Sequence, residues 1–118
     1  MIRALGSFGD PATRIENRVG EPAANPYLYL ASQIHAGLDG MQRQLDPGEP
    51  TDTPYEEAAP RLPQNLMDAI TALRGSELYR STMGAPFIDY LLTIKEAEVA
   101  RFLASVTDWE QREYFSIY

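Results

Sequence analysis

The sequence predicts a mainly α-helical protein in which one N-terminal β-strand is followed by four or five helices. Polar and apolar side chains alternate over residues 13–19, which is the period of a strand. Beyond residue 25, apolar residues recur at intervals of three and four, which is the period of amphipathic helices. Because 118 residues is the size of one ordinary domain, we expect residues 1–118 to form a single domain.

The strand is expected at residues 13–19, after an irregular, glycine-containing stretch at residues 1–12. Arg14, Glu16 and Arg18 fall on one face of this strand, and the apolar side chains fall on the other. A lone strand cannot satisfy its backbone hydrogen-bonding groups, and the sequence offers no evident sheet partner for it. The lack of a sheet partner therefore indicates that the chain is part of a larger protein or assembly that supplies one.

The first helix is expected to start at Asn25, whose side chain can cap it, with Pro26 at the first helical position. The last helix is expected to start at Thr107, which together with Glu110 fits a capping box. Residues 46–63 are rich in proline and predict a long loop. The expected helices cover residues 25–45, 63–74, 76–83, 86–106 and 107–114.

The composition excludes several classes of function. A net charge of −7 argues against nucleic acid as a partner, because phosphate binding needs clustered lysine and arginine. The sequence contains no run of about eighteen apolar residues, so no membrane span is expected. The absence of cysteine removes disulfides, thiolate metal sites and cysteine nucleophiles. A cytoplasmic protein is the default expectation, which the absence of cysteine permits without demonstrating it.

Specific motifs run along most of the chain: RIENR at residues 14–18, PAANPYL at 22–28, AGLDG at 36–40 and TDWEQREYF at 107–115. In these motifs and their spacing the sequence resembles the glutamine synthetase family. The resemblance begins at about residue 10 and reaches the end of the chain. The C-terminal motif is similar to the branch of γ-glutamyl amide and amine ligases. The fold implied by the resemblance is the C-terminal portion of the family's α/β catalytic domain.

The resemblance implies roles for the charged residues of the strand. Members of the family use ATP to phosphorylate the γ-carboxylate of glutamate, and ammonia or an amine then displaces the phosphate. Glu16 matches a carboxylate that holds Mg²⁺ or Mn²⁺ at the γ-phosphate of ATP. Arg18 matches a catalytic arginine on the transferred phosphoryl group, and Arg14 matches an arginine on the nucleotide phosphates. The chemistry suits these residues, because phosphoryl transfer depends on positioning and charge neutralisation.

A plainer interpretation remains open, in which Arg14, Glu16 and Arg18 form an exposed, salt-bridged strand face of little energetic consequence. The chain also lacks most of what the family needs, including the other metal carboxylates and the residues that bind glutamate. One glutamate and two arginines cannot build a two-metal site. Whether this chain is itself an enzyme is therefore uncertain, and we expect a fragment that is inactive in isolation.

The alternative is a non-catalytic helical module that self-associates or docks on a full-length relative. Four aromatic residues near the C-terminus favour contact with another chain, because exposed aromatic side chains are a liability for a monomer. They are Trp109, Tyr114, Phe115 and Tyr118. The family resemblance likewise implies an oligomer, because its active site lies between the subunits of a ring.

Overall fold

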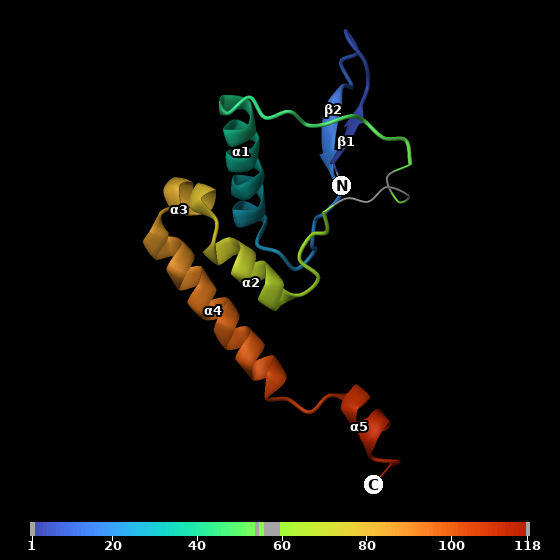
Figure 1. The fold of residues 1–118 in the computed structure, drawn as a ribbon, viewed down its shortest axis with the longest axis vertical. Coiled ribbons are helices and arrows are strands. Elements are labelled where there is room, and N and C mark those ends of the chain that lie inside the picture. The colour runs from blue at the N-terminus through green and yellow to red at the C-terminus, as the bar shows by residue number, and fades with distance from the viewer. Residues whose placement is uncertain (1, 54, 56–59, 118) are drawn as a thin grey trace. The chain divides into compact units, whose positions relative to one another are not determined.

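A computed structural model of the protein describes residues 2–53, 55 and 60–117. Within these residues two short strands precede five helices (Figure 1), so the mainly α-helical class is confirmed. The contacts divide the chain into two compact units, Met1–Ile34 and His35–Tyr118. The elements are β1 (Ile2–Leu5), β2 (Arg14–Asn17), α1 (Pro26–Gln42), α2 (Leu66–Arg74), α3 (Glu77–Met83), α4 (Ala85–Leu103) and α5 (Asp108–Tyr114).

The first unit contains an antiparallel hairpin, in which β1 pairs with β2. Arg3 lies opposite Glu16, and Leu5 lies opposite Arg14. The expectation that the strand has no sheet partner in this chain is therefore wrong. The partner was missed because β1 has four residues, too few to show a period of two beside the glycines that follow.

The loop between the two strands is held by its own backbone and by one hydroxyl group. The backbone N–H of Thr13 donates to the carbonyl of Asp10 at 3.0 Å, and the Thr13 hydroxyl donates to the carbonyl of Ser7 at 2.7 Å. Gly6 has a φ of +96°, which L side chains rarely adopt. The loop thereby fixes the register in which β1 faces β2.

Helix α1 starts where the sequence indicates. The side-chain oxygen of Asn25 accepts hydrogen bonds from the backbone N–H groups of Tyr27, at 3.0 Å, and Leu28, at 3.2 Å. These bonds satisfy donors that the first helical turn otherwise leaves unpaired. The helix ends at Gln42, three residues before the expected end at residue 45, and Gln44 then adopts a positive φ of 52°.

The core of the second unit lies between α2 and α4. Three hydrophobic side chains are buried among the described residues, Ile70 from α2 and Ile88 and Leu92 from α4. Partly buried side chains from α2, α3 and α4 pack around them. Among the helices of residues 2–53, 55 and 60–117, none combines the length and hydrophobicity that a membrane span needs.

Helix α5 begins with the capping box that the sequence predicts. The Glu110 backbone N–H donates to the Thr107 hydroxyl at 3.2 Å, and the Thr107 backbone N–H donates to the Glu110 carboxylate at 2.8 Å. These bonds from Thr107 lower the pKa of Glu110, because they favour the charged carboxylate. The Trp109 and Tyr114 rings meet edge to face, with centroids 6.1 Å apart, and both residues remain exposed. Tyr118 lies outside the described residues.

Candidate functional site

The hairpin gathers charge around one carboxylate. Glu16 lies in β2 opposite Arg3 of β1, and its Oε2 is 3.9 Å from the Arg3 Nη1. Its Oε1 is 3.7 Å from the Nε of Arg18, which follows β2 directly. A single glutamate is thus flanked by two guanidinium groups. Of the three predicted site residues, the structure brings Glu16 and Arg18 together.

Arg14 is placed differently. It begins β2, and its guanidinium Nη1 donates a 3.1 Å hydrogen bond to the carbonyl of Ala12. Among the ion pairs of the described residues, none joins Arg14 to Glu16. The side chain is exposed, and the bond that holds it is local. Arg14 therefore shares the strand with Glu16 without forming an ion pair with it in this structure.

Arg3 is the charged residue that sequence reasoning missed. Its position in an apparently irregular stretch gave no reason to place it beside Glu16. Residues Ile2–Leu5 gave no such signal, because one arginine among three apolar residues does not make a period of two. Once that segment is paired with β2, its arginine necessarily faces the glutamate. Arg3, Glu16 and Arg18 together are called the charged group below. It draws on β1, on β2 and on the residue that follows β2.

The charged group is open to solvent. The side chains of Glu16 and Arg18 are 40% and 48% exposed. At such exposure water screens an ion pair strongly, and pairs of this kind contribute roughly 0–1 kcal/mol to stability. The group therefore matters little as a stabilising feature. Its chemical value lies in the guanidinium groups, whose planar donors fit phosphate oxygens.

Whether the charged group could hold a divalent metal depends on how many oxygen ligands it offers. Mg²⁺ requires near-octahedral oxygen coordination. Over residues 2–53, 55 and 60–117, no group of three or more histidine or acidic side chains gathers where it could hold an ion. Glu16 supplies one carboxylate, and two arginines already face that carboxylate. The described residues therefore do not form a metal site of their own, although Glu16 has the chemistry of one ligand among several.

A hydrogen bond joins the end of the charged strand to α1. The Asn17 side-chain amide donates to the Gln33 side-chain oxygen. Asn17 also accepts a 3.0 Å hydrogen bond from the backbone N–H of Val19, which shapes the chain directly after β2. Both bonds lie within the first unit. They fix the position of Glu16 relative to the first turns of α1.

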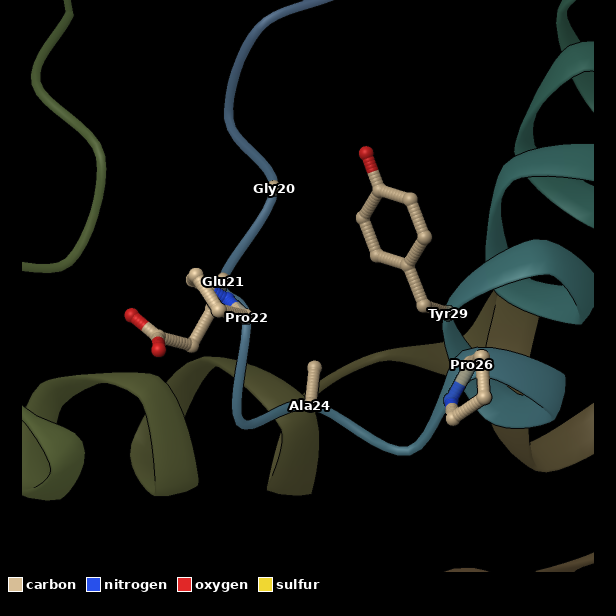
Figure 2. A pocket seen from close by; sticks show the side chains of 6 residues that line it. All are labelled: Gly20, Glu21, Pro22, Ala24, Pro26 and Tyr29. Carbon is tan, nitrogen blue, oxygen red and sulfur yellow. The ribbon is translucent and has the colours of Figure 1, made fainter.

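An open cavity of about 320 Å³ lies between the end of the strand segment and the start of α1. Figure 2 shows the Tyr29 ring along one side of it, facing the backbone at Gly20. The Glu21 carboxylate points away from that ring, and it accepts a 3.1 Å hydrogen bond from the backbone N–H of Ala23. The cavity is thus lined mainly by glycine, proline and an aromatic ring, and the charged group of β1 and β2 lies outside its lining.

Comparison with known proteins identifies the class. Residues 1–114 match the family described as glutamine synthetase, catalytic domain. This chain belongs to that family.

Individual relatives agree with that assignment. The chain is 49% identical to a gamma-glutamylanilide synthase from Acinetobacter, with 99% of the chain covered. It is 39% identical to a glutamine synthetase from Methanosarcina mazei, again over 99% of the chain, and 36% identical to a glutamate–methylamine ligase from Methyloversatilis universalis, over 96%. It spans 26%, 28% and 27% of these relatives, respectively. The chain thus corresponds to about a quarter of each relative's length.

Proposed function

We propose that residues 1–118 are the C-terminal portion of the catalytic domain of an ATP-dependent glutamate–ammonia or glutamate–amine ligase. On this proposal the hairpin supplies one part of a composite active site. The other metal ligands and the glutamate-binding residues come from sequence outside these 118 residues. The observation that carries the proposal is the position of Glu16 between Arg3 and Arg18 on paired strands, in a chain that belongs to the glutamine synthetase family.

The proposed roles follow from the charges and their placement. Glu16 would contribute one oxygen ligand to the divalent metal at the ATP γ-phosphate, where Mg²⁺ or Mn²⁺ would neutralise negative charge. Arg18 would contact the transferred phosphoryl group, and Arg14 the nucleotide phosphates. Arginine suits both tasks, because its fork of N–H donors remains charged and can bind two phosphate oxygens at once. On binding phosphate, Arg18 would exchange its weak ion pair with Glu16 for a charge-assisted bond to the ligand.

The amine substrate of the complete protein is part of the same proposal. One of the relatives is named for an anilide product, one for glutamine as its product, and one for methylamine as a substrate. We therefore propose glutamate and either ammonia or a small primary amine as substrates. We also propose assembly with further chains in the cytoplasm, which would cover exposed apolar side chains such as Phe115 and Ile15.

Phosphate release by the purified 118-residue chain tests whether the site is composite. The chain is incubated with ATP, Mg²⁺, glutamate and either ammonia or methylamine. We expect the same background rate for the native chain and for Glu16→Ala and Arg18→Ala, because one carboxylate cannot complete the metal site. Native phosphate release that both substitutions abolish would show that a working site lies within these residues, and the composite proposal would then be wrong.

A further inference from the structure

One side chain attaches the charged strand to α1, and it belongs to the residue between Glu16 and Arg18. Side chains alternate along a strand, so Asn17 projects from the face of β2 opposite to Glu16. Its amide donates a hydrogen bond to the side-chain oxygen of Gln33 in α1, and both residues are half-buried. The backbone that carries Glu16 and Arg18 is therefore held from its uncharged side.

This attachment acts at the point where β2 ends. Asn17 is the last residue of the strand, and its partner in β1 is Ile2, so Arg18 lies beyond the paired residues that the structure describes. The Asn17 side-chain oxygen accepts a 3.0 Å hydrogen bond from the backbone N–H of Val19, and this bond spans Arg18. The orientation of the Asn17 side chain therefore determines the path of the backbone at Arg18.

The hydrogen bonds around Asn17 have a fixed direction. Because its oxygen faces the Val19 N–H, its amide N–H groups face α1, where an acceptor must receive them. Gln33 supplies that acceptor, and its own amide nitrogen donates to the Ser32 hydroxyl oxygen at 3.4 Å. The Ser32 hydroxyl in turn donates to the carbonyl of Tyr29 at 2.7 Å. Position 33 therefore needs a side chain that reaches Asn17 and ends in an acceptor.

The two ion pairs of Glu16 hold it less firmly than this attachment does. They span 3.9 Å to Arg3 and 3.7 Å to Arg18 between exposed side chains, and water screens them. On the proposed function, moreover, Arg18 leaves its pair with Glu16 when it binds phosphate. The bond between Asn17 and Gln33 involves neither charged residue, so it persists in that state.

We infer that Gln33 is a positioning residue, which acts through Asn17 to hold Glu16 and Arg18 in the orientation that phosphoryl transfer requires. The inference rests on the proposed function of Glu16 and Arg18. Asn17 and Gln33 themselves do not contact the reacting atoms, because Asn17 projects from the opposite face of β2. Phosphoryl transfer depends on such positioning, and a misplacement of about 1 Å can slow a reaction roughly 100-fold.

Two substitutions at position 33 separate the hydrogen bond from packing. Gln33→Met keeps the length of the side chain and removes the acceptor, whereas Gln33→Glu keeps both, and all three residues have similar helix propensity. In the 118-residue chain we expect the Val19 backbone amide to exchange with solvent roughly fivefold faster in Gln33→Met, because Asn17 can then turn away. In Gln33→Glu it should exchange at the native rate. The Thr13 amide, which is bonded within the loop between the strands, should be unchanged in both.

The effect on catalysis is measured in a chimera that carries residues 1–118 in place of the matching segment of the Acinetobacter gamma-glutamylanilide synthase. We expect Gln33→Met to lower kcat about tenfold and to leave the KM for glutamate unchanged, because on the proposed function the glutamate-binding residues lie outside this segment. Gln33→Glu should retain the native kcat, since the acceptor for Asn17 remains. A side chain that only stabilised the fold would not separate kcat from KM, nor distinguish two variants that are equally folded.

Glu16→Ala in the same chimera distinguishes failure of this inference from failure of the proposed function. If Glu16→Ala abolishes amide synthesis while Gln33→Met and Gln33→Glu give equal kcat values, the proposed function stands and the positioning role of Gln33 is wrong. Equal exchange of the Val19 amide in the two variants would also overturn that role. If Glu16→Ala leaves kcat unchanged, the proposed function is wrong, and the positioning role is wrong with it.

Discussion

Replacing Leu92 with alanine is expected to lower the free energy of unfolding of the second unit (His35–Tyr118), whose core lies between α2 and α4, by about 2–5 kcal/mol. Leu92 is 1% exposed and is one of the three buried hydrophobic residues that the structure describes. Deleting its side chain removes buried apolar surface and leaves a cavity that the two neighbouring buried isoleucines, Ile70 and Ile88, cannot fill. Urea unfolding followed by far-ultraviolet circular dichroism measures the change, because this unit holds most of the helix.

Leu103→Ala is the matched control. Leu103 is the last residue of the same helix, α4, and is 66% exposed, so its truncation makes the same chemical change and removes little buried surface. We expect a change within about 0.5 kcal/mol. Equal losses for Leu92→Ala and Leu103→Ala would mean that the packing of α2 on α4 does not stabilise this unit.

Replacing Gly6 with alanine is expected to disrupt the pairing of β1 with β2. A Cβ at this position would lie 2.6 Å from the Thr13 Cα, a backbone atom that cannot move without shifting β2. The positive φ of 96° adds a cost of about 1–2 kcal/mol for an L residue. Loss of the nuclear Overhauser contacts between Arg3 and Glu16 would report the disruption, and the charged group would then lose its cross-strand ion pair.

Gly9→Ala separates conformational strain from collision. Gly9 also has a positive φ, of 81°, but an added Cβ would meet nothing within 4 Å. The hairpin should therefore weaken in Gly9→Ala and still form. If both variants kept the Arg3–Glu16 contacts, the close approach of Gly6 to Thr13 would not be a feature of the protein in solution.

The starts of α1 and α5 could be predicted from the sequence because local chemistry determines them. The Asn25–Pro26 pair and the Thr107–Glu110 capping box act within one turn, and each is found where its residues indicate. Strand β1 could not be predicted from the sequence, because it forms by pairing with residues that lie beyond the intervening loop. For the buried core, the sequence showed only that apolar residues recur at intervals of three and four beyond residue 25. Which of these apolar residues are buried depends on where α2 packs against α4, and periodicity does not encode that packing.

The candidate site, like the fold, could be predicted from the sequence only in part. Alternation predicted that Glu16 and Arg18 share a face, and the ion pair between them confirms their proximity. Alternation could not predict that Arg14 bonds to Ala12, because an exposed arginine follows whichever local acceptor it reaches. Arg3 required the strand pairing to be known. The catalytic and metal-binding roles of Arg14, Glu16 and Arg18 stay predictions.

We propose that these residues complete an active site whose other parts lie elsewhere in a longer chain. A chimera tests it most directly, in which residues 1–118 replace the matching segment of the Acinetobacter gamma-glutamylanilide synthase, with which they share 49% identity. We expect the chimera to retain amide synthesis. Glu16→Ala should lower its kcat by about 100-fold or more, as when one preorganised electrostatic group is removed from an active site. Glu49→Ala, an exposed loop carboxylate, should leave kcat unchanged. An active chimera indifferent to Glu16→Ala, or an inactive one that folds and assembles like its parent, would contradict the claim.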